Sequence, residues 1–266
     1  YGLLLGLLSI FGVGGRKIFA PIHRPNASMS SFRRWLYRLL CRRLDVIFAT
    51  SEYVREGWMA YCKKDLSRVL YPGVIKDMGA DFVSGERRSV LFWRNANREN
   101  GADIACTAVK NLAGRMKDID FVFAVRPSDE LEAKLLELER EFSNVYVHLY
   151  PYSDGVTLQE LLNRSLFVLA PFRYLSMNPQ MAILETLYAG VPVVASDVES
   201  NSELVVNGET GIVFASKEAS VLEDIIENLL KDRAYLMKLQ KNARPLTAKK
   251  WNWRDYQEGL IAIVEG

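Results

Sequence analysis

Short apolar runs alternate with helical stretches along the whole chain, and this alternation constrains the fold more than any other feature. The apolar runs are rich in Val, Ile and Phe on both faces, as expected for strands covered on both sides. The predicted strands cover residues 17–22, 45–49, 68–71, 89–93, 120–125, 145–149, 166–170, 192–195 and 212–214. The predicted helices cover residues 32–43, 52–62, 101–115, 129–142, 157–164, 179–189, 217–243 and 253–264. This order predicts an α/β protein with parallel, doubly wound sheets.

A chain of 266 residues is long enough for two hydrophobic cores. The segment 71–89 opens with a Pro-Gly turn, has no sustained periodicity and precedes a new strand, which is typical of a domain boundary. We therefore expect residues 1–72 to be the last part of one Rossmann-like domain and residues 73–250 to be a second. The apolar residues 1–13 are too few to span a bilayer and predict a core helix instead of a signal peptide, and a chain that starts inside a helix indicates a fragment.

Charge is distributed unevenly. Residues 1–72 hold 12 Lys and Arg against 4 Asp and Glu, which favours an anionic partner. Within them, helix 32–43 is basic and amphipathic, and it can bind an anionic membrane or an acidic partner, or simply present a solvated face. We expect no nucleic-acid partner.

The cysteines are Cys41, Cys62 and Cys106, and they show no paired spacing. The chain has only two histidines. We therefore expect neither a disulfide framework nor a Cys/His metal site, and a reducing, cytoplasmic setting, at the inner face of the membrane if helix 32–43 binds there.

The segment 171–195 predicts a loop, a short buried helix, a glycine stop and a strand. Asn178 suits the N-cap, Pro179 the first helical position and Gly190 the residue after the helix. The helix is almost wholly apolar and carries a single acid, Glu185. Because a buried carboxylate is costly, either a basic side chain or the hydroxyl groups of a ligand must satisfy it. The helix N-terminus can receive an anion such as phosphate, so the segment indicates a nucleotide-type ligand.

Further candidates follow strands. Arg94 directly follows the strand 89–93, and Arg98 follows within RNANRENG, beside a helix start at Asn100 and Gly101. Guanidinium groups there suit a diphosphate, although surface arginines in a loop are the alternative. His23 ends the first strand, where it suits acid–base or hydrogen-bonding work, and a structural histidine is the alternative.

Other polar residues are expected to be structural. His148 lies inside a predicted strand, and Asp118 and Asp120 lie at the amino side of one, a poor place for a metal-binding pair.

These segments together resemble the retaining, nucleotide-sugar-dependent glycosyltransferases of family 4, in order along nearly the whole chain. The most specific match is ILETLYAGVPVVASDVESNSELVVNGETGIVF; the others are KIFAPIH, LDVIFATSEYVREGW, RVLYPGV, RNANRENG and WNWRDYQEGLIAIVE. The resemblance implies the two-domain GT-B fold with the start of the first domain missing, and a closing helix at 251–266 that crosses back to that domain. It also implies a UDP- or GDP-sugar donor, a glycan or lipid-linked acceptor, and no metal or other cofactor.

The resemblance also implies roles for individual residues. Glu185 matches the acid that binds the ribose hydroxyls, Arg94 the diphosphate-binding arginine, and His23 the histidine near the donor sugar. The backbone around Asn178, Pro179 and Gln180 would meet the donor phosphates or sugar.

Two positions depart from the family pattern. Met177 stands where the family has its first glutamate, and Asn100 stands where it has a basic residue, with Arg98 nearby as a substitute. The sequence therefore predicts a sugar transferase, with two alternatives. One is a catalytically weak nucleotide-sugar-binding module that acts with a partner enzyme; the other, less favoured, is a sugar-nucleotide epimerase on the same fold.

Overall fold

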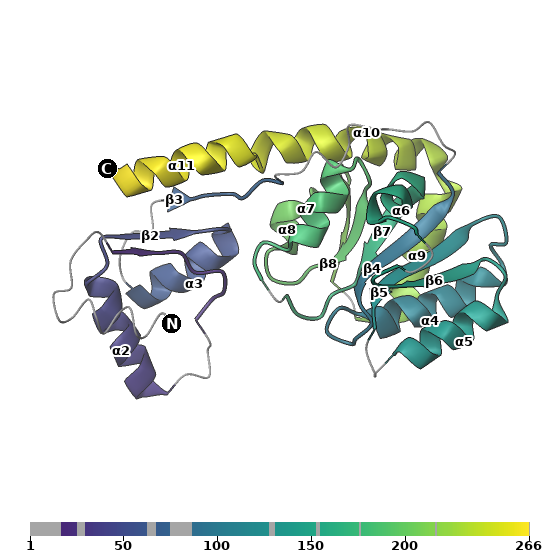
Figure 1. The fold of residues 1–266 in the computed structure, drawn as a ribbon, viewed down its shortest axis with the longest axis horizontal. Coiled ribbons are helices and arrows are strands. Elements are labelled where there is room, and N and C mark those ends of the chain that lie inside the picture. Colours follow the sequence, from purple (N-terminus) through teal and green to yellow (C-terminus); the bar gives the residue numbers. More distant parts are fainter. Residues whose placement is uncertain are drawn as a thin grey trace. The chain divides into compact units, whose positions relative to one another are not determined.

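The structure is a computed structural model that describes residues 17–25, 30–62, 68–74, 87–127, 131–152, 155–175, 177–215 and 217–265, with only the backbone for residues 60–62. The chain divides into two compact units (Figure 1). Unit 1 comprises Tyr1–Gly73, Met177–Pro179 and Trp251–Gly266, and unit 2 comprises Val74–Ser176 and Gln180–Lys250. The expected helix at 1–13 and most of the expected boundary segment lie outside the described residues.

Unit 1 is built on a parallel sheet of three strands in the order β1-β2-β3. The strands are β1 (Ile18–Phe19), β2 (Val46–Ala49) and β3 (Arg68–Val69), and the helices are α2 (Ser31–Arg42), α3 (Glu52–Cys62) and α11 (Trp253–Glu265). Its small core gathers around Trp58, whose ring meets Phe19 edge-on at 5.0 Å and Tyr37 at 5.8 Å. The closing helix belongs to this unit, because a Cβ on Gly259 would lie 2.5 Å from the Leu70 side chain.

Unit 2 is built on a parallel sheet of six strands in the order β6-β5-β4-β7-β8-β9. The chain begins in the middle of the sheet at β4, moves outward to β6, and then crosses back to build β7, β8 and β9 on the other side. This is the doubly wound order, with the switch of direction between β4 and β7. The strands are β4 (Ser89–Asn95), β5 (Asp120–Arg126), β6 (Val145–Leu149), β7 (Ser165–Ala170), β8 (Val193–Ser196) and β9 (Gly211–Phe214).

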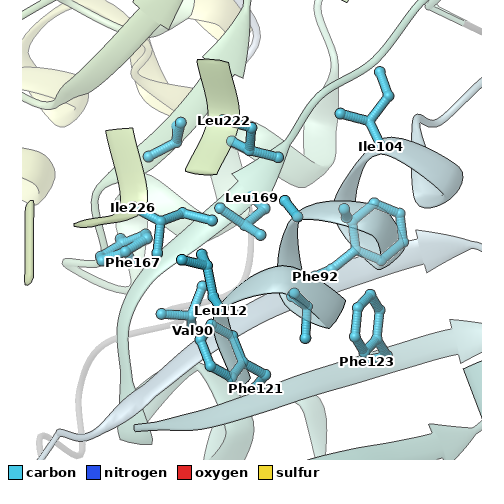
Figure 2. Close-up of a cluster of buried hydrophobic side chains, with 14 of the residues drawn as sticks. Val90, Phe92, Ile104, Leu112, Phe121, Phe123, Phe167, Leu169, Leu222 and Ile226 are labelled. Atoms are coloured by element: carbon cyan, nitrogen blue, oxygen red, sulfur yellow. The ribbon is translucent and has the colours of Figure 1, made fainter. Parts of the chain in front are cut away.

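Helices cover both faces of this sheet. They are α4 (Ala102–Ala113), α5 (Glu132–Glu141), α6 (Leu158–Arg164), α7 (Met181–Tyr188), α8 (Asn201–Leu204), α9 (Ala219–Lys231) and α10 (Arg233–Lys250). Figure 2 shows the core on one face of the sheet, a cluster that includes Phe92 and Phe123 from the strands, Leu112 of α4 and Leu222 of α9. Leu91, the residue between Val90 and Phe92, points to the opposite core with Leu162 of α6. The apolar character of both strand faces is explained by this double cover.

Several predicted elements differ from the observed ones. β1 covers only Ile18–Phe19 instead of 17–22, and α8 was not predicted. The predicted helix 217–243 is two helices, α9 and α10, because the Asp232 carboxylate between them accepts a hydrogen bond from the Tyr235 amide at 2.9 Å and caps α10.

The cysteine prediction is wrong for Cys41, which is disulfide-bonded, whereas Cys106 is free as expected. The cysteine pattern therefore no longer supports a reducing compartment. Asp120 is structural as predicted, since its carboxylate forms an ion pair with Arg88 at 2.7 Å. His148 lies half-buried in β6, as the sequence predicts. Among the described residues, no helix combines the length and the apolar character needed to cross a membrane.

Candidate functional site

The carboxyl ends of β4 and β7 mark the switch point of unit 2, where ligands of doubly wound sheets bind. Arg94 is the next-to-last residue of β4 and pairs with Val125 of β5. Its Nη2 donates a hydrogen bond to Oε1 of Gln180 at 3.1 Å, and its Nε is buried without a hydrogen-bond partner. Burial lowers the pKa of Arg94; Glu185 raises it and Arg126 lowers it further. A half-buried guanidinium with an unused donor suits an anionic acceptor.

Gln180 connects this arginine to helix α7. Its carbonyl accepts the first helical hydrogen bonds, from the Ile183 amide at 3.1 Å and the Leu184 amide at 3.4 Å, so Gln180 is the N-cap residue. Its side chain does not cap the helix and instead accepts from Arg94. The side-chain Nε2 is buried and has no partner, and the residue is only 1 % exposed. Two unused donors, from Arg94 and Gln180, thus lie in one place.

The prediction of Asn178 as the N-cap and Pro179 as the first helical residue is therefore wrong. Helix α7 begins at Met181. The backbone of Asn178 is used in unit 1, where its amide donates to the Ile22 carbonyl at 3.1 Å and its carbonyl accepts from the Thr50 hydroxyl at 2.6 Å. The predicted helix stop is confirmed: Gly190 follows α7 with a φ of 69°.

Glu185 is the single acid of α7 and is half-buried. Desolvation raises its pKa, and the positive charge of Arg94 opposes this shift. Within the described part of the chain the two side chains form neither an ion pair nor a hydrogen bond with each other. The sequence left two partners open for this carboxylate, a basic side chain or a ligand. The structure places the positive charge of Arg94 near enough to lower the pKa of Glu185, and it leaves the carboxylate oxygens available to accept from the hydroxyl groups of a ligand.

The relative position of Arg94 and Glu185 is set by the residues beside them. The indole Nε1 of Trp93 donates to the Thr186 hydroxyl at 3.0 Å, and that hydroxyl donates to the Ala182 carbonyl at 2.8 Å. Thr186 is fully buried. The neighbouring residues on β4 and α7 are thereby held together, which fixes the separation of the cation and the carboxylate.

The loop after β4 approaches the loop after β7 very closely. Gly101 has a φ of 69°, and a Cβ placed on it would lie 1.9 Å from the Pro171 carbonyl oxygen. Arg173 fastens the same two loops: its guanidinium contacts both carboxylate oxygens of Asp103, at 2.5 and 2.9 Å, and donates to the Arg98 carbonyl at 2.7 Å. Asn100 is used locally, because its side chain donates to Asn97 Oδ1 at 2.7 Å, and the side chain of Arg98 is exposed.

The remaining predicted residues belong to unit 1. His23 is half-buried, and its carbonyl accepts from the Trp58 indole at 2.7 Å. Met177 is half-buried, and Pro179 is buried. The hydrogen bonds of Asn178 place this short segment beside Ile22 and Thr50, which follow β1 and β2 at the carboxyl edge of the three-stranded sheet. His23 and the segment 177–179 therefore share one edge of unit 1.

Sequence reasoning missed the side-chain role of Gln180, the Trp93–Thr186 link and the Arg173–Asp103 pair. Of these, the sequence gives a signal only for Trp93. A partly buried tryptophan usually has a hydrogen-bond acceptor for its indole N–H, and Trp93 lies directly before the site arginine. In the described ranges of the chain, no group of three or more His, Cys, Asp or Glu side chains is arranged to hold a metal ion.

Comparison with curated proteins finds glycosyltransferases. The chain is 28 % identical over 184 residues to the alpha-D-kanosaminyltransferase of Streptomyces kanamyceticus, covering 67 % of this chain and 45 % of that protein. It is 22 % identical over 232 residues to an uncharacterized glycosyltransferase of Methanocaldococcus jannaschii, covering 87 % of this chain and 62 % of that protein. The chain thus spans between about half and two thirds of these relatives.

Comparison with solved structures gives the same fold. The Anabaena Alr3699/HepE structure in complex with UDP matches with a TM-score of 0.79 at 16 % identity, covering all of this chain and 77 % of that one. Sucrose-phosphate synthase from Thermosynechococcus elongatus matches with a TM-score of 0.75 at 16 % identity, covering 98 % of this chain and 70 % of that one. The predicted fold class, GT-B with Rossmann-like domains, is confirmed.

The family model described as "Glycosyl transferases group 1" matches residues 76–245, which include every predicted site residue of unit 2. That range is well over half of the 266 residues. The chain belongs to the group 1 glycosyl transferases.

Proposed function

We propose that this protein transfers a sugar from a nucleotide-sugar donor to an acceptor hydroxyl, with retention of configuration at the anomeric carbon. The observation that carries the proposal is the half-buried guanidinium of Arg94 at the switch point, whose buried Nε has no hydrogen-bond partner and whose charge acts on the Glu185 carboxylate. Membership of the group 1 glycosyl transferases supports the same reaction class.

The donor would bind with its diphosphate on Arg94 and at the N-terminus of α7, where the unused Nε2 of Gln180 supplies a further donor. Arg98, exposed on the same loop, adds positive charge. The ribose hydroxyls would donate to Glu185, whose carboxylate forms no hydrogen bond or ion pair with the residues that the structure describes. The structural relative HepE was solved with UDP, and we therefore expect this protein to bind UDP more tightly than GDP.

Catalysis would come from stabilising the leaving diphosphate. As the bond between the anomeric carbon and the phosphate oxygen breaks, negative charge grows on the phosphate, and the partly desolvated guanidinium of Arg94 would stabilise that charge. The acceptor hydroxyl attacks from the face that the diphosphate leaves and passes its proton to a phosphate oxygen. His23 would contact the donor sugar. Arginine side chains supply the positive charge that balances the diphosphate, so this mechanism requires no divalent metal. The acceptor would be a glycan or a lipid-linked sugar.

Titration calorimetry with UDP and GDP tests nucleotide binding on the wild type, Arg94→Ala and Glu185→Ala. Losing one charge-assisted contact of roughly 1.5–3 kcal/mol should weaken binding about 10- to 100-fold in each variant. Arg140→Ala and Glu137→Ala, both exposed on α5, are matched controls that should bind as the wild type does. If neither nucleotide binds the wild type, the proposal is wrong.

A second candidate is a nucleotide-sugar-binding module that acts with a partner enzyme. Met177 favours it, because a thioether replaces a carboxylate that would hold sugar hydroxyls. The two candidates differ in turnover: the full-length protein incubated with a UDP-sugar and an acceptor should release UDP if it is a transferase, whereas the module binds without release. The expected cytoplasmic location stays a prediction, and fractionation of cells that express the full-length protein tests it.

A further inference from the structure

Helix α2 exposes two aromatic side chains that the core of unit 1 does not use. Phe32 is 68 % exposed and Trp35 is 57 % exposed. Their rings stack on each other, with centroids 6.0 Å apart and an interplanar angle of 28°. Every residue from 31 to 35 is exposed. The first turns of α2 therefore present an aromatic pair to solvent, although large apolar groups on a helix normally face a core.

The opposite side of α2 makes the contacts that hold the helix in unit 1. Leu40 and Cys41 are buried, and Tyr37 packs edge-on against Trp58. At 100° per residue, these three side chains point to one side of the helix, and Phe32 and Trp35 point away from it. The aromatic pair is thus a second apolar surface, separate from the one that stabilises the fold.

Arginines surround this second surface. Arg33, Arg38, Arg42 and Arg43 are exposed, and in the described part of the chain none of them forms an ion pair. The sequence contains no Asp or Glu between Lys17 and Leu44. The surface therefore joins exposed aromatic rings to a dense, uncompensated positive charge.

We propose that α2 is a membrane-docking helix that lies in the interface of a bilayer rich in anionic phospholipids. Phe32 and Trp35 would enter the boundary between headgroups and acyl chains, with the arginines at the lipid phosphates. An anionic protein surface would satisfy the charge alone, whereas a lipid interface also receives the two rings, since interfacial helices combine these two residue classes. This binding is independent of nucleotide binding and of sugar transfer.

Topology adds a consequence within unit 1. Helix α2 connects the parallel strands β1 and β2, so its first turn lies toward the edge at which those strands end. His23 follows β1 at the same edge. The aromatic pair and the histidine therefore lie toward the same end of the unit. If the protein transfers sugar as proposed, a lipid-linked acceptor would reach His23 from the docked membrane.

Vesicle flotation of the whole chain tests the docking, with two kinds of vesicle: phosphatidylcholine alone, and equal parts of phosphatidylcholine and phosphatidylglycerol. The wild type should bind only the mixed vesicles, and added salt should weaken binding. Arg38→Gln/Arg42→Gln/Arg43→Gln should bind about 100-fold more weakly, from roughly fivefold for each charge near an anionic surface. Phe32→Ser/Trp35→Ser should bind about 10-fold or more weakly, because the buried aromatic area is lost.

Matched controls separate this helix from general charge. Lys217→Gln/Lys241→Gln/Arg254→Gln removes the same charge from other exposed positions, and Met237→Ser removes an apolar side chain that is 63 % exposed. Both should bind as the wild type does. Trp35 emission should shift to shorter wavelength with mixed vesicles, measured as the difference from Trp35→Phe. The proposal is overturned if the wild type does not bind mixed vesicles, if it binds neutral vesicles equally, or if the charge control loses as much binding as the arginine variant. Circular dichroism spectra and urea unfolding midpoints that match those of the wild type show that the docking variants are folded.

Discussion

Replacing Gly101 with alanine should destabilise unit 2 through two separate effects. The first is backbone strain, because a φ of 69° costs an L-residue about 1–2 kcal/mol. The second is a collision, because the new Cβ would lie 1.9 Å from the Pro171 carbonyl oxygen and 2.7 Å from its carbonyl carbon. These are backbone atoms, so the two loops must separate, at a further cost of about 1–3 kcal/mol. We expect a total loss of about 2–5 kcal/mol in the free energy of unfolding.

Gly155→Ala supplies the matched control. Gly155 has a φ of 78°, but a Cβ there would meet nothing within 4 Å. This variant should lose only the strain, about 1–2 kcal/mol. Urea unfolding followed by circular dichroism measures both losses, and calorimetry with UDP should show weaker binding to Gly101→Ala alone, since its separated loops flank Arg94. Equal destabilisation by the two substitutions would refute the close approach of the loops as the reason for glycine at position 101.

Three further outcomes follow from the contacts of the site. Because burial raises the pKa of Glu185 above its ordinary value, the folded protein binds the proton more tightly than the unfolded chain, so this group lowers stability as pH rises through the raised pKa. Glu185→Gln should therefore unfold at a higher urea concentration than the wild type at neutral pH, with the difference disappearing below pH 4.5, while UDP affinity falls. Trp93→Phe should cost about 1–2 kcal/mol in urea unfolding and weaken UDP binding, because the Thr186 hydroxyl loses a partner; unchanged UDP affinity would show that the link does not position Arg94 and Glu185. Burial raises the pKa of Asp103, but the hydrogen bond and charge of Arg173, with two backbone hydrogen bonds, outweigh burial and hold it below the ordinary carboxyl value. The pair therefore stabilises the fold fully above the ordinary pKa, and this stabilisation is lost as pH falls through the lowered pKa. Arg173→Gln should destabilise the protein by about 1–3 kcal/mol at neutral pH and by less in acid, and a loss independent of pH would contradict this account.

The sequence was sufficient to predict the doubly wound architecture and the place of Arg94, because both follow from strand periodicity and strand order along the chain. It was not sufficient for the start of α7. Local preferences favour Asn178 as the cap, but the hydrogen bond from Thr50 comes from 128 residues away and uses the Asn178 carbonyl elsewhere. Gln180 occupies the N-cap position in its place, without a capping hydrogen bond from its side chain, and glutamine has no particular preference for that position.

Two other errors have the same kind of cause. The break between α9 and α10 depends on one aspartate, Asp232, in a stretch without Gly or Pro, so periodicity alone predicts one helix. The disulfide of Cys41 depends on tertiary proximity, which cysteine spacing does not report. Gln180 and Glu185 belong to one helix, whereas Arg94 comes from a strand far earlier in the chain. The Arg94–Gln180 and Trp93–Thr186 contacts set the spacing between them, and both join residues more than 80 positions apart.

Arg94, Gln180 and Glu185 all belong to unit 2, whereas His23 and the segment 177–179 belong to unit 1. If nucleotides bind where we propose, unit 2 contains the residues that recognise the nucleotide and unit 1 contains the residues proposed to surround the sugar. Recombination between relatives at positions near 74 and 250 would then exchange the residues around the sugar and keep those that bind the nucleotide. The segment 177–179 belongs to unit 1 but lies, in the sequence, between the two parts of unit 2. Such a chimera would therefore keep this segment from one parent and the rest of unit 1 from the other, and the two would have to be compatible.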